Sequence, residues 1–211
     1  MYIPHPSAEL NALFVAKPYQ GVALDEATFL FVGLDANYDE QIDRSQTSPA
    51  IREYHDDGVA FWQRHGVHHP FLLSAYSGDG RRYHRNFARI GFRPEHALQI
   101  SFAELLHVPT VGRSALVPQD LDPVHLQTLD AAILGGAAKH IFLSAGVVRL
   151  MRASGAFPWL RSAKESTGPL RVFHADSART VYQHLHLSNY GKFEKQMVLE
   201  AHAIRSLLPS N

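Results

Sequence analysis

An alternation of short apolar runs with longer amphipathic segments is the feature that most constrains how this chain can fold. The apolar runs have the length of strands and end at glycine or at polar residues; they cover residues 28–33, 98–102, 140–144 and 170–174. The expected helices lie mainly between them, over residues 49–65, 81–90, 123–138, 146–154 and 190–207. Strands that alternate with helices predict an α/β protein with a central, mostly parallel four-stranded sheet.

The length of 211 residues fits a single domain that spans residues 1–211. Residues 1–20 are expected to form an N-terminal arm, in which Ser7 caps a short helix that Pro18 ends. Residues 39–82 are long for a plain connection between two elements, which indicates an insertion or a lid beside a pocket.

Composition excludes several classes of protein. The chain has no cysteine, which excludes disulfides, thiolate zinc sites and a cysteine nucleophile. It has no apolar run long enough to cross a membrane and no secretory signal pattern at its N-terminus, so we expect a cytoplasmic protein without a membrane partner. Lys+Arg and Asp+Glu both number 20, which is less basic than is usual for a DNA-binding protein. The basic residues are clustered, however, and Arg85 lies in the densest stretch, residues 81–89.

Asp35 is the first candidate for chemistry. The apolar run from Phe29 to Val32 stops at Gly33, and Asp35 follows two positions later with no Lys or Arg beside it. Ligands of open α/β sheets bind at the carboxyl ends of the strands, where such an acid can act as a general base. The alternative is that Asp35 caps the turn or helix that follows.

A second polar cluster begins after the last apolar run, with His174, Ser177 and Arg179, and a tail of mixed, helical-looking pattern is expected to follow it. A loop that contains Pro109, Thr110, Gly112, Arg113 and Ser114 follows the second run. Taken in order with the turn Gly33-Leu34-Asp35-Ala36-Asn37 and the aromatic-basic segment 83–91, this set of motifs resembles the uracil-DNA glycosylase superfamily. The resemblance is nearest to the mismatch-specific and thymine-DNA branch, and it covers roughly residues 28–205.

The resemblance implies a three-layer α/β/α sandwich and a monofunctional DNA glycosylase that needs no cofactor or metal and acts as a monomer on DNA. Such an enzyme moves a base out of the duplex before it cleaves the sugar bond. Asp35 is expected to activate water, and His174 is expected to donate a hydrogen bond to the departing base. The expected contacts to the base come from residues near the first turn, the second strand and the insertion: Gly33, Leu34, Ala36, Asn37, Tyr38, Tyr54, His55 and Phe102. The expected contacts to DNA are Arg85, Arg113, Ser114, Ser177 and Arg179. Arg179 would also fill the place that the flipped nucleotide leaves in the duplex.

Departures from the family pattern bear on the substrate. Ala36 and Ala175 stand where prolines are usual, and residues 101–104 contain no Asn to read a pyrimidine edge. These departures, with the long 39–82 segment, favour a bulky modified pyrimidine, such as the glucosylated cytosine of phage DNA, over plain uracil. A uracil or thymine mismatch glycosylase, a binder of DNA or nucleotides without activity and an unrelated α/β hydrolase remain alternatives.

Overall fold

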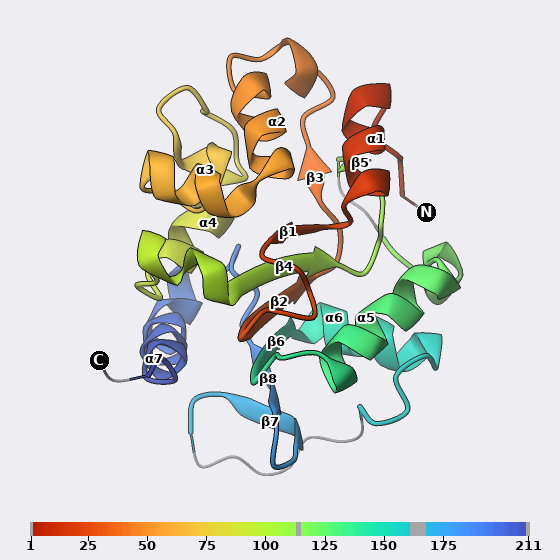
Figure 1. The fold of residues 1–211 in the computed structure, drawn as a ribbon, viewed down its shortest axis with the longest axis vertical. Helices are drawn as coiled ribbons and strands as arrows, with labels where there is room; N and C mark the ends of the chain where they lie inside the picture. Colours follow the sequence, from red (N-terminus) through yellow and green to blue (C-terminus); the bar gives the residue numbers. More distant parts are fainter. Residues whose placement is uncertain (1, 113–114, 161–167, 210–211) are drawn as a thin grey trace.

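The β2 strand (Phe29–Gly33) occupies the middle of the molecule and corresponds to the first predicted strand (Figure 1). The computed structural model describes residues 2–112, 115–160 and 168–209. Its main sheet has six strands in the order β1-β4-β2-β6-β8-β7. The β4 (Ile100–Glu104), β2, β6 (His140–Ser144) and β8 (Thr180–His184) strands run parallel, whereas β1 (Tyr19–Gly21) and β7 (Arg171–Ala175) are antiparallel edge strands. The protein is therefore an α/β protein with a mixed, mostly parallel sheet.

The predicted sheet needs two corrections: it has six strands instead of four, and the last predicted strand is not part of its parallel core. Residues 171–175 form the edge strand β7, which turns back into β8 through residues 176–179. Asp176 makes this reversal because its Oδ1 accepts the backbone N–H groups of Ala178 (2.7 Å) and Arg179 (2.9 Å). The fourth parallel strand is β8, a segment for which the sequence predicted a helical tail.

The predicted helices are present, with one division. The segment expected as a single helix over 49–65 is split into α2 (Ser48–Asp56) and α3 (Gly58–His65), because Asp57 is extended and its Oδ1 caps α3 at the N–H groups of Val59 and Ala60. Ser7 caps the N-terminal helix, as predicted, and the Asp122 side chain caps the helix that starts at Pro123. The other α-helices are α1 (Ala8–Ala16), α4 (Arg81–Ala88), α5 (Pro123–Gly135), α6 (Ala145–Ser154) and α7 (Glu194–Arg205).

Helices cover both faces of the parallel strands. Successive side chains of β2 point to opposite faces, so Leu30 and Val32 belong to one core cluster and Phe29 and Phe31 to another. The first cluster includes residues of α5 and α6, such as Leu129, Ile133, Val147 and Met151. The second includes residues of α3, α4 and α7, such as Trp62, Phe87 and Ile204. Burial on both faces explains why β2 is a continuous apolar run.

A third apolar cluster joins the N-terminal arm to the 39–82 segment. Leu10 and Phe14 of α1 pack with Ile51 of α2, with Phe71 and with Tyr38 of the short strand β3 (Asn37–Tyr38). The β3 strand pairs with β5 (Thr110–Val111) outside the main sheet. The arm and the long segment thus form one unit that lies above the end of β4 in Figure 1. None of the helices within the described residues is both long and apolar enough to cross a membrane.

A cavity at the carboxyl ends of the parallel strands

A cavity of about 890 Å³ opens where β2 and β4 end. Its walls come from the turn after β2, the end of β4, the start of α4, the 39–82 segment and the loop after β8. Five carboxyl side chains line it, and no Lys or Arg of the described residues does; the five are Asp35, Asp39, Glu40, Asp79 and Glu104. Because phosphate is unfavourable against so many acids, the cavity suits an uncharged ligand or an uncharged part of a larger one.

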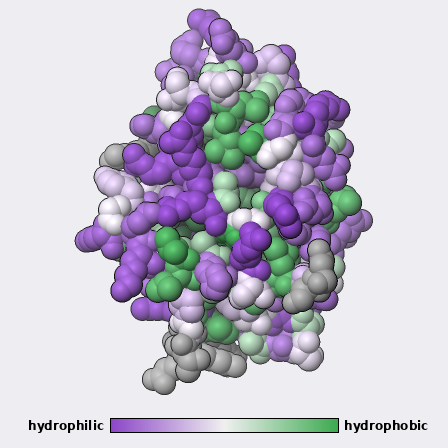
Figure 2. Space-filling model, turned by 90° about the vertical axis from the view of Figure 1, so that its left-hand side faces the viewer, coloured by the Kyte–Doolittle hydropathy of each residue, from purple (hydrophilic) through white to green (hydrophobic). Residues whose placement is uncertain are grey.

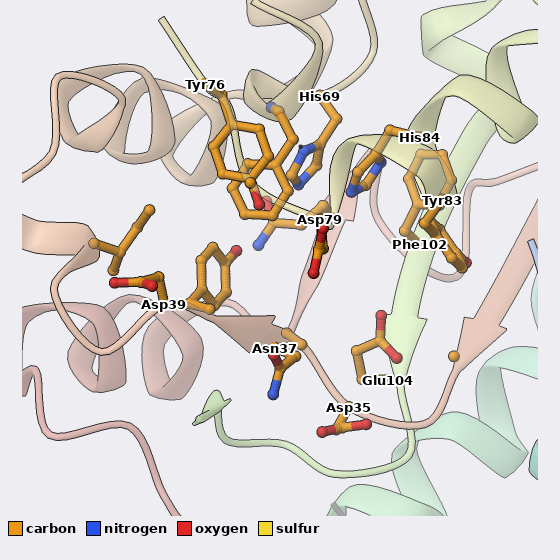
Figure 3. A pocket seen from close by; sticks show the side chains of 18 of the residues that line it. Asp35, Asn37, Asp39, His69, Tyr76, Asp79, Tyr83, His84, Phe102 and Glu104 are labelled. Carbon is orange, nitrogen blue, oxygen red and sulfur yellow. Dashed lines mark hydrogen bonds between the residues drawn. The ribbon is translucent and has the colours of Figure 1, made fainter. Parts of the chain in front are cut away.

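Asp35 lies at the floor of this cavity, two residues after β2 (Figure 3). Its Oδ2 accepts a hydrogen bond from the Thr110 hydroxyl at 2.6 Å, and the Asn37 amide donates to the same hydroxyl at 3.1 Å. Asn37 also donates to the Gly112 carbonyl. The hydrogen bond from Thr110 fixes one oxygen of Asp35, and the carboxylate lines the cavity. A general base needs such access to a bound ligand.

Glu104 is the second acid at the floor, and the sequence analysis did not select it. It ends β4 and pairs in the sheet with Gly33, the last residue of β2. Its carboxyl lies so close to Gly33 that a Cβ built there would be 2.0 Å from Oε2, so a side chain at position 33 would displace it. Burial, and then the charge of Asp35, raise the pKa of Glu104 to about 8. At neutral pH Glu104 is therefore mostly a neutral acid that can donate a hydrogen bond.

One wall of the cavity is aromatic and uncharged. Phe102 precedes Glu104 by two residues and points to the same side of β4, and Tyr83 and His84 come from α4 (Figure 3). The His84 ring stacks on His69, with centroids 3.5 Å apart and an interplanar angle of 7°. Burial lowers the pKa of His84 to about 3, so this ring stays neutral near pH 7. The flat, uncharged wall suits the face of an aromatic ring.

His186 and Ser188 bring the loop after β8 to the same cavity. The backbone N–H of Ser188 donates to His186 Nδ1 at 3.2 Å, and the Ser188 hydroxyl lies 2.6 Å from the same nitrogen. Because a backbone N–H can only donate, Nδ1 is an acceptor and the proton of neutral His186 belongs on Nε2. Burial lowers the pKa of His186, and the charge of Asp35 acts in the opposite direction. His186 can therefore offer a neutral N–H donor.

The structure brings most of the predicted base contacts together at this cavity. Those that line it, along with Asp35, are Gly33, Leu34, Ala36, Asn37, Tyr38, Tyr54 and Phe102. His55 lies behind them: its Nε2 is 3.2 Å from the Tyr38 hydroxyl and its Nδ1 is 2.6 Å from Gln20 Nε2. Arg85 is exposed on α4 outside the cavity lining, and Arg113 and Ser114 lie outside the described residues.

His174, Ser177 and Arg179 are not brought to Asp35, which corrects the predicted grouping. His174 pairs with Val181 at the start of β8, and the start of β8 is level with Phe29 at the start of β2. These residues therefore lie toward the opposite end of the parallel strands from Asp35. The reason is the tight reversal at Asp176, which makes β7 antiparallel.

The contacts of this second group are local. His174 Nε2 lies 3.1 Å from Asp176 Oδ2, and Ser177 is exposed in the turn. Arg179 donates to the Ile133 carbonyl in the last turn of α5, and only 11% of its side chain is exposed. An arginine at the C-terminal end of a helix satisfies the hydrogen-bonding need of a terminal carbonyl, and its positive charge interacts favourably with the helix dipole. Both effects stabilise the fold.

Within the described residues, no group of three or more His, Asp or Glu side chains is arranged to hold a metal ion. Comparison of the chain with models of known protein families, with curated proteins and with solved structures gave no match. The case for function therefore depends on the geometry of the cavity.

Proposed function

We propose that the protein is a DNA glycosylase that hydrolyses the N-glycosidic bond of a flipped, modified pyrimidine and leaves an abasic site. The observation that carries the proposal is the placement of Asp35 at the carboxyl end of β2, on the floor of an acidic cavity with one aromatic wall. A neutral base fits such a cavity, whereas the negatively charged backbone of DNA would stay outside it.

The architecture supports this proposal. The parallel strands β4-β2-β6-β8 are the second, first, third and fourth in chain order, and helices cover both of their faces. We infer that these layers form the three-layer α/β/α sandwich expected for the uracil-DNA glycosylase superfamily. Ligands of such open sheets bind beyond the carboxyl ends of the strands, where Asp35 lies.

The proposed chemistry uses four side chains that line the cavity. The Asp35 carboxylate can accept a proton from the attacking water and stabilise the positive charge that develops on the sugar. The Nε2–H of His186 can donate to an oxygen of the departing base, the role that the sequence analysis gave to His174. Phe102 and Tyr83 can contact the faces of the base.

The size of the cavity favours a pyrimidine with a large substituent. Its volume of about 890 Å³ lies near the upper end of ordinary ligand pockets, which span about 300–1,000 Å³. Polar side chains of the 39–82 segment also line the cavity and can form hydrogen bonds with the hydroxyls of a sugar; they include Asp39, Ser45, Thr47 and Asp79. Glucosylated 5-hydroxymethylcytosine is the substrate that we favour.

The face around α4 is the proposed approach for DNA. Figure 2, turned toward the side on which α3, α4 and α7 lie in Figure 1, shows a mainly hydrophilic surface with hydrophobic patches near its centre. Arg82 and Arg85 are exposed on α4, beside Tyr83 and His84 of the cavity wall. Arginines at the rim can contact phosphates while the base enters the uncharged interior.

The test uses oligonucleotide duplexes with one defined base each: uracil, thymine opposite guanine, 5-hydroxymethylcytosine or its glucosylated form. Alkali after incubation converts each abasic site into a strand break. We expect breaks with the glucosylated base, far fewer with uracil, and a large loss with Asp35→Asn. Efficient excision of plain uracil would contradict the substrate assignment, and the absence of breaks in all four duplexes would contradict the glycosylase proposal.

A further inference from the structure

Two carboxyl groups of different character, those of Asp35 and Glu104, line the cavity floor. Asp35 is tied to the Thr110 hydroxyl. Within the described part of the chain, no group donates a hydrogen bond to the carboxyl of Glu104, although its backbone carbonyl accepts from His125 Nε2 at 2.8 Å. Figure 3 shows the Glu104 carboxyl directed into the cavity above Asp35. It is therefore available to a ligand.

We propose that Glu104 is a general acid that gives its proton to the ring nitrogen N3 of a cytosine-type base as that base leaves. The inference depends on the proposed glycosylase function and specifies its substrate class. When the environments of two neighbouring carboxyl groups keep one protonated and the other ionised, the first can act as a general acid and the second as a general base. Cleavage of glycosidic bonds commonly uses such a pair. Here Glu104 is the acid and Asp35 is the base.

The step balances with the Glu104 and Asp35 carboxyl groups, the substrate and one water molecule. The C1′–N1 bond breaks and its electron pair stays on the base, while N3 takes the Glu104 proton, so the base leaves as a neutral tautomer. Water forms a bond to C1′ of the cationic sugar and gives one proton to Asp35. Glu104 is left as a carboxylate and Asp35 as an acid, and a proton exchange through solvent resets both.

The protonation of ring nitrogen N3 explains why the proposed substrate is a cytosine-type base. N3 of cytosine has no proton and is a basic acceptor, whereas N3 of uracil already carries one. The cytosine anion is also the poorer leaving group, so protonation assists it more. The second oxygen of Glu104 can accept from the 4-amino group next to N3, which gives two hydrogen bonds along one edge of the base.

The other titratable groups around Glu104 do not replace it as the acid. Burial raises the pKa of Tyr38, Tyr54 and Tyr83, whose hydroxyls come from β3, α2 and α4, so they stay protonated well above pH 8. Burial lowers the pKa of His84 and His186, so they are neutral there. Asp35, from the loop after β2, is the charged group that raises the pKa of Glu104 after burial itself.

The experiment compares the wild type with Glu104→Gln, which keeps the shape and a hydrogen-bond donor but has no proton to transfer. Glu26→Gln, an exposed carboxyl outside the cavity lining, is the matched control. Single-turnover rates and duplex affinity are measured from pH 5 to pH 9.5 on duplexes with glucosylated 5-hydroxymethylcytosine, 5-hydroxymethylcytosine or 5-hydroxymethyluracil.

We expect the wild-type rate on the cytosine-type bases to fall above about pH 8. Glu104→Gln should lower that rate by ~10²–10⁴-fold, the usual contribution of a general acid, with affinity nearly unchanged. Its effect on any excision of 5-hydroxymethyluracil should be much smaller. Wild-type excision that Glu104→Gln leaves intact, or equal losses on both kinds of base, would overturn the role of Glu104 but not the glycosylase function. Excision of none of the bases by the wild type would overturn both.

Discussion

Replacement of Glu104 by Gln should stabilise the fold at neutral pH, and this effect can be measured without any substrate. The pKa of Glu104 is raised from 4.5 to about 8 in the folded protein. Between these values the unfolded chain loses the Glu104 proton and the folded protein keeps it, so wild-type stability falls as the pH rises. Each pH unit corresponds to about 1.4 kcal/mol, which amounts to roughly 3 kcal/mol at pH 7 as an upper limit. Gln does not ionise, so the variant does not lose this stability as the pH rises.

The assay is urea unfolding of the wild type, Glu104→Gln and the control Glu26→Gln at several pH values between 4 and 8. The stability difference between Glu104→Gln and the wild type should be small at pH 4, because Glu104 is then mostly protonated in both states and Gln carries no charge. It should grow with pH, be greatest near pH 8 and exceed the Glu26→Gln difference at that pH. A Glu104→Gln difference that stays constant with pH would refute the view that Glu104 keeps its proton inside the cavity.

Three further substitutions test other parts of the account. Asp35→Asn should lower the single-turnover excision rate by ~10²–10⁴-fold with little change in DNA affinity, because it removes the base that activates water; a rate within a few-fold of the wild type would argue against that role. Gly33→Ala places a Cβ 2.0 Å from Glu104 Oε2, so it should displace that flexible side chain at little cost in stability. Excision should fall about as strongly as in Glu104→Gln, and full activity would show that the position of the carboxyl is unimportant. Arg179→Ala should lower the free energy of unfolding by about 1.5–3 kcal/mol, because the hydrogen bond to the Ile133 carbonyl is lost. The ratio of excision rates on duplex and single-stranded DNA should stay unchanged, and a loss of activity confined to duplex DNA would restore Arg179 as a DNA contact.

The sequence was sufficient to predict the centre of the fold and half of the candidate site. The run Phe29–Val32 ending at Gly33 predicted β2 correctly, because a strand buried on both faces is apolar throughout. The same turn predicted that Asp35 and its neighbours line a pocket, because the carboxyl end of a central strand is where such pockets form.

The other half of the site depends on tertiary pairing. The sequence alone does not single out Glu104, because only the register that pairs it with Gly33 places its carboxyl at the same cavity floor as Asp35. His186 was missed because Thr180–His184 was expected to be part of a helical tail. A signal was present, since Thr, Val and Tyr at the start of that segment favour a strand. Recognition of β8 as the fourth parallel strand would have moved the second motif from His174 to His186.

The most direct test of the central claim is mass spectrometry of the products formed from glucosylated phage DNA in water enriched in oxygen-18. We expect free glucosylated 5-hydroxymethylcytosine with its sugar substituent intact, and one oxygen-18 atom at C1′ of each abasic site, from the wild type and in far smaller amounts from Asp35→Asn. Release of glucose alone, or DNA that keeps all of its bases, would contradict it.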